Sequence, residues 1–365
     1  MSDEGMLNVR DFGAVGDGSA DDTAAIQKAI DAAAESRGTV CVPPGTFRAA
    51  GLKMHSHTGI VGRPTWSYRD FGGSILRLAD PAAACLLDLT GAVGVTVNGL
   101  CLDGGHPRTA WRDGGFTGSA CGVLFDKPDY GTEEDNPRIE RCRVGNFAGD
   151  GIRLGRIWCW SVRHCMVCFN GGSGIYVRGW DGFLLDTWLS GNVGAGYGTD
   201  AENASTTITA NRIEWNQRGG IVLGASENYN ITGNYLDRAG GCALRVRPGG
   251  SRPNNNIAVT GNVIYRSGRP DWRALGEHES SHLWIEETTG LVVTGNTFRV
   301  WRDDGPVGHF SPRFGIVYRA LADSVIAHNV LSAGALDKLL VDLGEHGENV
   351  VVADNPGSLF VPPAD

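Results

Sequence analysis

The sequence has little lysine and no long apolar segment. Four of its 32 basic residues are lysines, so arginine carries most of the positive charge. No stretch approaches the run of about eighteen apolar residues that marks a membrane-spanning helix. The formal net charge of −9 argues against nucleic acid or an anionic membrane as the main partner. With 41% hydrophobic residues, the chain can still build a large core.

The cysteines show no disulfide-scaffold spacing, and their number, nine, is odd. Several lie inside apolar stretches, so we expect free, buried thiols. The pair Cys165 and Cys168 has no second pair to complete a zinc site, and neither a metal nor another cofactor is predicted. Met1 is followed by Ser-Asp-Glu-Gly rather than by a basic and apolar leader, which predicts no export signal and favours a cytoplasmic location.

Glycine, by contrast, is abundant, with 54 of 365 residues, which is too many for a mostly helical chain. Many glycines belong to an internal repeat in which a short apolar strand, a glycine turn and another strand follow an anchor residue. The anchors Cys142, Cys165, Thr187, Asn211 and Asn234 are 23, 22, 24 and 23 residues apart. Later anchors are more widely spaced because loops are inserted between them.

A period near 23 with three short strands predicts an all-β fold, a right-handed parallel β-helix of about ten coils. Asparagines recur at one place in the repeat, where we expect a left-handed turn residue and amides stacked from coil to coil. They are Asn211, Asn234, Asn262, Asn296 and Asn329, with Asn98 and Asn355 predicted for the same place at either end. Long loops are expected at 104–119, 127–137, 266–281 and 302–314, where the pattern lapses.

Residues 1–60 do not repeat and are expected to cap the stack, whereas 61–365 form one continuous domain. Asp22 and Thr23 can cap a helix. The apolar positions Ile26, Ala29, Ile30 and Ala33 fall on one face of that helix.

The same amino-terminal residues carry a family resemblance. The segment Asn8-Val-Arg-Asp-Phe-Gly-Ala-Val-Gly-Asp-Gly, followed by Gly38-Thr-Val-Cys-Val-Pro-Pro-Gly-Thr-Phe, resembles the opening of pectate-lyase-like β-helix proteins related to glycoside hydrolase family 28. That superfamily includes pectin and alginate lyases, polygalacturonases, epimerases, fructotransferases and phage tailspikes. The resemblance implies a carbohydrate ligand and a possible homotrimer. It does not select the reaction, because the polygalacturonase Gly-His-Gly is missing and Asp303-Asp304 falls in a loop.

The third strand of each coil is the candidate floor of a binding groove, since solenoids commonly bind along one sheet. Strand alternation predicts these inward side chains: Ile175, Val177, Tyr197, Thr199, Ile221, Leu223, Leu244 and Val246. It predicts these outward positions: Tyr176 and Arg178, Gly198 and Asp200, Val222 and Gly224, Ala243 and Arg245, then Trp284 and Glu286. In the predicted groove, small residues form the base, and charged and aromatic side chains stand on either side of it.

Asp200 and Glu202 are the candidate catalytic carboxylates, because cleavage of a glycosidic bond needs a paired acid and base. Glu286 lies three coils from Asp200, about 14 Å, which is far for a direct partner. The alternative is that these carboxylates are solvated turn residues or form ion pairs with Arg178.

Glu214 and Asp237 form a second candidate pair, at equivalent outward places on the middle strands of adjacent coils. Two carboxylates about 5 Å apart would bracket a cation or share a proton. The alternative is neutralisation by arginines, namely Arg212, Arg218 or Arg238.

Aromatic and basic residues complete the predicted groove. Trp272, Trp284 and Trp301 lie near two long loops and could pack against sugar rings or fill those loops. Arg178, Arg245 and Arg247 could bind a sugar carboxylate or steady an enolate oxygen, or could form structural ion pairs. His278-Glu-Ser-Ser-His282 matches a zinc-protease motif, but the motif requires a helix and a strand is predicted to follow.

The sequence thus predicts a carbohydrate-active enzyme, of glycoside hydrolase or polysaccharide lyase type, that cleaves or rearranges glycosidic linkages. Two alternatives remain open. The first is an intracellular β-helix enzyme, such as a lyase, cyclase, epimerase or fructotransferase, acting on a small metabolite or oligosaccharide. The second is a non-catalytic carbohydrate-binding spike.

Overall fold

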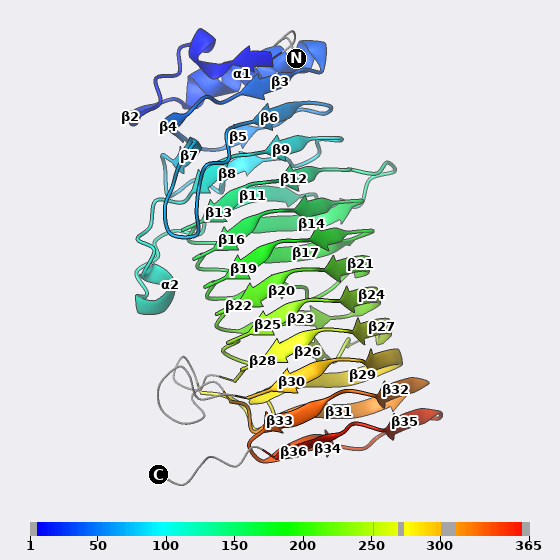
Figure 1. Ribbon diagram of the computed structural model, residues 1–365. Coiled ribbons are helices and arrows are strands. Elements are labelled where there is room, and N and C mark those ends of the chain that lie inside the picture. The colour runs from blue at the N-terminus through cyan, green and yellow to red at the C-terminus, as the bar shows by residue number, and fades with distance from the viewer. Residues whose placement is uncertain (1–5, 251, 269–273, 301–310, 360–365) are drawn as a thin grey trace. The chain divides into compact units, whose positions relative to one another are not determined.

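The computed structural model describes residues 6–250, 252–268, 274–300 and 311–359. The chain divides into two compact units, residues 1–188 (unit 1) and 189–365 (unit 2). Each unit is built from coils of short parallel strands, which confirms the predicted all-β parallel β-helix (Figure 1). No described helix is long and apolar enough to cross a membrane.

In unit 1 the strands form three layers, A, B and C. The A layer contains β5 (Leu52–Lys53), β8 (Cys85–Asp88), β11 (Cys121–Asp126), β14 (Ile152–Trp158) and β17 (Ile175–Trp180). The B layer contains β1 (Met6–Asn8), β3 (Thr39–Cys41), β6 (Gly59–Val61), β9 (Thr96–Asn98), β12 (Arg138–Glu140), β15 (Ser161–Arg163) and β18 (Phe183–Leu185). The C layer contains β2 (Asp17–Asp21), β4 (Gly45–Ala49), β7 (Ser74–Leu78), β10 (Cys101–Asp103), β13 (Arg143–Gly145) and β16 (Met166–Cys168).

Unit 2 repeats the same three layers. Its A strands are β20 (Ala195–Gly198), β23 (Gly219–Gly224), β26 (Leu244–Arg247), the first part of β29 (Ser281–Thr294), β31 (Phe314–Ala322) and β34 (Lys338–Asp342). Its B strands are β21 (Asn203–Thr209), β24 (Ser226–Thr232), β27 (Asn254–Thr260), the last part of β29, β32 (Ser324–Ala327) and β35 (Val350–Ala353).

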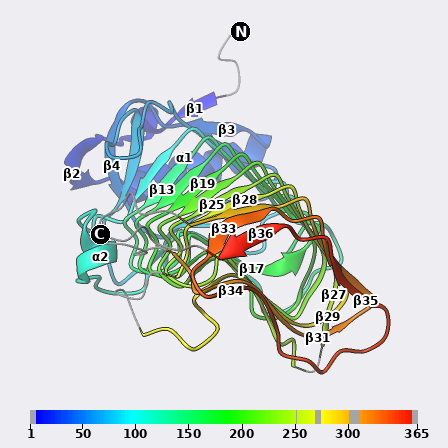
Figure 2. The ribbon, with the colours of Figure 1, turned by 60° about the horizontal axis from the view of Figure 1, so that its bottom comes forward.

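The C strands of unit 2 are β22 (Arg212–Glu214), β25 (Tyr235–Asp237), β28 (Val263–Tyr265) and β30 (Thr297–Arg299). A separate pair, β33 (Leu331–Ala335) with β36 (Gly357–Leu359), follows them. Figure 2 shows β25 and β28 on one side of the coils and β27 and β35 on another. The strand β19 (Trp188–Ser190) contains the boundary between the units. The A layer corresponds to the predicted third strand of the repeat.

A helix, α1 (Thr23–Ser36), follows a 3₁₀ turn, η1 (Val9–Phe12), and β2. The predicted apolar face is confirmed, because Ile26, Ala29, Ile30 and Ala33 are fully buried. The predicted cap is wrong in detail. The Asp22 carboxylate accepts from the backbone amides of Val15 and Gly16 instead of from the first turn of the helix. It is Asp21 that accepts from the amide of Thr23.

Side-chain alternation places the core between the three layers. All eight predicted inward residues of the A strands are at most 1% exposed. Burying each large aliphatic side chain contributes roughly 1.5–3 kcal/mol, so these rows carry much of the stability. The free thiols are also as expected, since Cys142, Cys165, Cys168 and Cys242 are buried and form no disulfide.

The asparagine ladder is confirmed in unit 2. The side-chain oxygen of Asn234 accepts from both the backbone and side-chain nitrogens of Asn211, at 3.0 and 2.9 Å. The same pattern continues through Asn262, Asn296 and Asn329 to Asn355. From Asn234 to Asn355 each ladder amide also donates to a backbone carbonyl, as in the 2.8 Å bond from Asn234 to Ile208, which satisfies its second N–H.

Two details of the predicted ladder are wrong. Asn98 does not belong to it, because it lies inside β9 and pairs with Glu140 of β12. The ladder place in that coil is held by Leu100, whose carbonyl accepts from Arg143. The left-handed residue is also not the asparagine itself but the residue before it, such as Gly233 with φ of 65°.

Candidate functional site

The structure brings Asp200 and Glu202 to the turn between β20 and β21, at the edge of the A layer of unit 2. Both are exposed; Asp200 is the second residue after β20, and Glu202 directly precedes β21. They therefore stand where the predicted groove needs carboxylates. Their roles as acid and base stay a prediction.

A buried polar network holds this turn. The Asn203 amide donates to the carbonyl oxygen of Gly224 at 3.0 Å, and its oxygen accepts from the Ser226 hydroxyl at 2.8 Å. Glu202 has a left-handed backbone with φ of 50°. Such a conformation is strained for a residue with a side chain, so the surrounding hydrogen bonds must stabilise it. Asp200 and Glu202 thus lie on a fixed turn.

Asp200, Gly224 and Arg247 occupy one line across three coils. An added Cβ on Gly224 would lie 3.6 Å from the Asp200 Cα, and Gly224 pairs with Arg247 in β26. Two strand spacings, about 10 Å, separate the acidic and the basic residue. Gly224 is recessed between them. We call the line Asp200, Gly224, Arg247 the A row; its low floor lies between an exposed carboxylate and an exposed guanidinium.

Glu286, predicted as an outward catalytic carboxylate, is 6% exposed. Its oxygens accept from Arg245 and, at 3.1 Å, from Arg319. The Arg245 guanidinium lies 3.6 Å from the centroid of the Trp284 ring, and burial lowers the pKa of Arg245. Because two guanidinium groups engage the Glu286 carboxylate, the geometry suits it to holding arginines in place rather than to transferring a proton.

Tyr176 and Arg178 lie on β17 of unit 1 and are half-buried. The Arg153 guanidinium stands 4.4 Å from the Tyr176 ring centroid and pairs with Asp150 at 3.1 Å and Asp126 at 3.6 Å. Burial raises the pKa of Asp150. The sequence analysis missed this cluster, although Asp126 and Arg153 fall on outward positions of β11 and β14 and strand alternation could have revealed them.

The structure corrects the interpretation of Glu214 and Asp237. They pair in register on β22 and β25, as predicted, but they are only 4% and 1% exposed. Arg266 binds Asp237 through two nitrogens at 2.8 and 2.6 Å, Arg238 binds it at 2.5 Å, and Arg212 binds Glu214 at 3.1 Å. Arginine side chains thus bind both carboxylates, which form a buried ion-pair network, as the arginine alternative predicts. Burial raises the pKa of Asp237.

Of the three predicted tryptophans, only Trp284 can be placed, because Trp272 and Trp301 lie outside the described residues. Trp284 is half-buried on β29. Its indole nitrogen is buried and has no hydrogen-bond partner within the described part of the chain. The ring supports Arg245 and is not an open platform.

The zinc-protease motif is not formed. Residues 277–279 are a turn, and β29 begins at Ser281. His282 therefore points into the coil, fully buried against the Phe298 ring, whereas His278 packs on Trp284. Burial lowers the pKa of His282 to about 3. Within 6–250, 252–268, 274–300 and 311–359, no group of three or more His, Cys, Asp or Glu could hold a metal ion.

Comparison with known proteins agrees with this fold. Residues 6–69 match the family described as rhamnogalacturonase A/epimerase, pectate lyase-like, and residues 200–355 match the right-handed β-helix region. The chain is similar to the A-module of mannuronan C-5 epimerase AlgE6 from Azotobacter vinelandii. The TM-score is 0.73 and the identity 18%, over 98% of this chain and all of that one. It also resembles tailspike protein 2 of an Escherichia coli O157:H7 bacteriophage (TM-score 0.71, 15% identity, 89% of this chain and 43% of that one).

Curated relatives add sequence similarity. Mannuronan C5-epimerase AlgE2 of Azotobacter vinelandii is 28% identical over 72% of this chain and 25% of its own length. Alginate lyase 7 of the same organism is 33% identical over 39% of this chain and 17% of its own length.

The putative phage-related protein YobO of Bacillus subtilis is 27% identical over 79% of this chain and 35% of its own length. The chain thus spans about a quarter of the length of the epimerase and about a third of that of YobO. In the motif at its amino terminus and in the fold of its coils, the chain is similar to pectate-lyase-like right-handed β-helix proteins.

Proposed function

We propose that this chain acts on a uronate-containing polysaccharide and removes a proton next to the sugar carboxyl group, as a C5-epimerase or a lyase. The observation that carries the proposal is the 28% identity to a mannuronan C5-epimerase over 72% of the chain. The shorter match to an alginate lyase supports the same substrate class. The A row supplies side chains of the type that this chemistry requires.

Both reactions begin with the same step. A base takes the C5 proton, and the electron pair left on C5 delocalises into the carboxylate to give an enolate. An epimerase then returns a proton to the opposite face of C5. A lyase instead expels the oxygen at C4 and leaves a C4–C5 double bond. The enzyme must therefore stabilise the charge that develops on the carboxylate and provide a base and an acid.

The A row suits these tasks. We assign Arg247 to the sugar carboxylate, because a guanidinium can donate two parallel hydrogen bonds to it. Asp200, about 10 Å away across Gly224, is assigned to proton transfer, with Glu202 as the second carboxylate. Arg245, held by Glu286 and Trp284, adds positive charge beside the row. Glu286 is assigned to positioning that arginine.

The test compares the turnover of mannuronan in heavy water by the wild-type protein and by the Asp200→Asn variant. An epimerase incorporates deuterium at C5, whereas a lyase produces an ultraviolet-absorbing unsaturated sugar. We expect the substitution to lower turnover about a hundredfold or more. The free energy of unfolding should change by less than about 1 kcal/mol, as for other exposed side chains. Glu227→Gln, which changes an exposed carboxylate on the B strand β24, is the matched control and should retain activity.

Other products would contradict the proposal. Reducing ends formed without unsaturation or deuterium exchange would indicate hydrolysis. Unchanged turnover in both Asp200→Asn and Glu202→Gln would remove the A row from the reaction.

A second candidate is a carbohydrate-binding protein of the phage type. It is favoured by the match to the phage-related protein YobO, which covers 79% of this chain. This candidate predicts saturable binding of a polysaccharide with neither exchange at C5 nor chain cleavage.

A further inference from the structure

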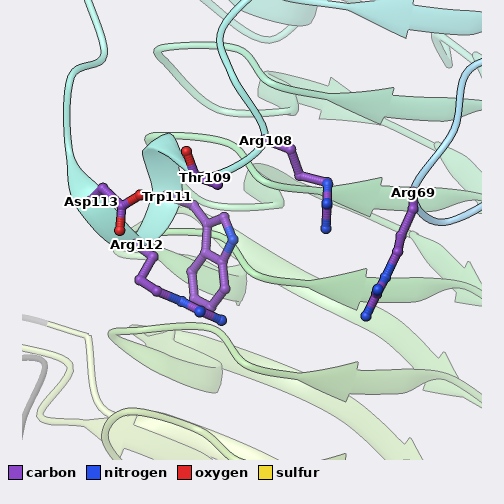
Figure 3. Close-up of a pocket in the computed structure, with 6 residues that line it drawn as sticks. All are labelled: Arg69, Arg108, Thr109, Trp111, Arg112 and Asp113. Atoms are coloured by element: carbon purple, nitrogen blue, oxygen red, sulfur yellow. The ribbon is translucent and has the colours of Figure 1, made fainter.

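A hollow of about 270 Å³ lies on unit 1 (Figure 3). Two loops border it: 62–73, which joins β6 to β7, and 104–119, which contains the short helix α2 (Ala110–Asp113). Both loops border the C layer. The hollow is lined by Arg69, Arg108, Thr109, Trp111, Arg112 and Asp113.

The three arginines of this hollow are not used in ion pairs among the described residues. Arg69, Arg108 and Arg112 are exposed, and none forms an ion pair with a carboxylate in the described part of the chain. Elsewhere, arginines such as Arg266 and Arg319 are paired with buried acids. Figure 3 shows the three guanidinium groups extending in the same direction as the Trp111 ring. In a chain of net charge −9, three arginines against the single carboxylate of Asp113 make this a local excess of positive charge.

Aromatic contacts fix both loops. Tyr68, next to Arg69, stacks on Trp188 with ring centroids 4.6 Å apart and also packs on Phe169. The Arg108 guanidinium lies 5.8 Å from the centroid of the same Phe169 ring. Trp111 is 7% exposed and packs on Phe169 from another side. The loops that carry the arginines thus pack on aromatic side chains. This packing reduces the conformational entropy that the loops lose when a ligand binds.

A buried arginine adds charge on the same layer. Arg143 on β13 is fully buried, and its three side-chain nitrogens have no hydrogen-bond partner within the described residues. Its guanidinium lies 4.4 Å from the ring centroid of Phe71, in the loop that carries Arg69. Arg143 and Arg108 both act on the Cys168 thiol, which burial nevertheless holds at a pKa of about 11. A charge in a low-dielectric interior is weakly screened, so it strengthens the attraction for an anion.

We infer that this hollow binds one acidic saccharide residue, with its carboxylate or sulfate group held between Arg69, Arg108 and Arg112. Guanidinium groups match the geometry of such oxyanions, and the volume suits a single sugar unit rather than a chain. The saccharide part of the inference rests on the proposed function; the anionic part rests on the arginines. The hollow lies on unit 1 beside the C layer, whereas the A row consists of residues of unit 2.

The test is calorimetric titration of the Asp200→Asn/Arg247→Gln variant, in which the A row is inactivated. The probes are a short mannuronate oligosaccharide, a sulfated neutral oligosaccharide and the same neutral oligosaccharide without sulfate. We expect the acidic probes to bind and the neutral one not to bind. Adding Arg108→Gln and Arg112→Gln should weaken binding about tenfold or more. Binding of the sulfated oligosaccharide would show that the hollow accepts acidic sugars in general, whereas binding of the mannuronate probe alone would restrict it to uronates.

Arg218→Gln is the matched control, because Arg218 is exposed on unit 2 and takes part in no ion pair with a described residue. It should leave the affinity unchanged. Equal binding with and without the hollow's arginines, or equal binding of the neutral probe, would overturn the inference. The two proposals fail separately: absent turnover on any polysaccharide removes the proposed function, whereas the arginine variants alone decide the hollow.

Discussion

Gly224 is the residue on which the geometry of the A row depends. Its backbone does not require glycine, because its φ is not in the left-handed range and an added Cβ would meet no atom closer than 3.5 Å. A larger side chain would instead fill the space between Asp200 and Arg247. We therefore expect Gly224→Leu to lower kcat/KM on a polysaccharide at least tenfold, with little change in thermal stability.

Gly224→Ala is the control for this substitution, since it adds a methyl group at ordinary contact distance. It should keep most of the activity. A Gly224→Leu variant with full activity would show that the substrate does not cross the A row.

His282 predicts a pH dependence of stability. Its pKa is lowered from 6.5 to about 3 by burial, so the folded protein keeps it neutral whereas the unfolded chain protonates it below pH 6.5. The lowered pKa therefore gives stability that is present above pH 6.5 and is lost as the pH falls toward 3. At a pH two units below 6.5 the loss is about 2–3 kcal/mol.

Denaturant unfolding at neutral and acidic pH checks this value. His282→Gln should remove that part of the pH dependence, because the amide does not titrate. His164→Gln is the control for the substitution itself, because it replaces an exposed imidazole outside the core. Identical pH profiles for wild type and His282→Gln would contradict the burial of a neutral imidazole.

Strand alternation predicts on which face of a sheet a residue lies, but it does not predict which other side chains cover that residue. The sequence correctly placed Glu214 next to Asp237 and Glu286 on an A strand. It could not show that Arg266 and Arg319, from neighbouring coils, fold over these carboxylates. Long flexible side chains decide which acids are exposed, and strand periodicity carries no information about their rotamers.

At the scale of elements, the asparagine ladder is the feature that ties coil to coil in unit 2. The Asn262 oxygen accepts from both nitrogens of Asn234, and its own nitrogen donates to Ile231 and Asn296. Asn262→Ala would leave several of these buried groups without partners. We expect a loss of unfolding free energy on the order of 3 kcal/mol, measured by chemical denaturation.

Asn255 provides the comparison for the ladder variant. It lies on the neighbouring strand β27 but is exposed, so Asn255→Ala should change the unfolding free energy by less than about 0.5 kcal/mol. Equal effects of the two substitutions would mean that the ladder hydrogen bonds add no stability beyond that of a surface amide.

The wrong prediction that Asn98 belongs to the ladder also has an explanation at this scale. Gly99, Gly233, Gly261 and Gly295 all have positive φ and stand directly before the ladder residue. A left-handed residue, glycine in these four coils and Ala210, His328 or Asp354 in others, thus precedes the ladder place. A search for that glycine would have selected Leu100 instead of Asn98. The conformational requirement lies in the turn, whereas the amide is needed only where a neighbouring coil supplies another amide.

At the scale of the whole molecule, the fold could be predicted because period and alternation are properties of the sequence alone. The site could not be predicted to the same depth. The A row follows from strand register, but the arginine hollow depends on how loops 62–73 and 104–119 pack on Phe169 and Trp188. Contacts between loops far apart in sequence leave no periodic signal.

The nine thiols give a test of packing over the whole molecule. Seven of the cysteines are buried, and only Cys41 and Cys159 are partly accessible. Burial raises the pKa of Cys85 and Cys101 to about 12 and that of Cys121 to about 11. The thiolate is the reactive form, so both exclusion of the reagent and the raised pKa slow labelling.

We therefore expect at most two thiols to react rapidly with a charged disulfide reagent in the native protein, and all nine in denaturant. The buried cysteines are spread over coils of both units, so each reports on the closure of its own coil. Replacing Cys41 and Cys159 by serine should abolish the rapid phase and leave the slow one. Rapid labelling of more than two thiols in the parent protein, or of any thiol in the double variant, would show that coils open independently, which coils joined by parallel strand pairing should resist.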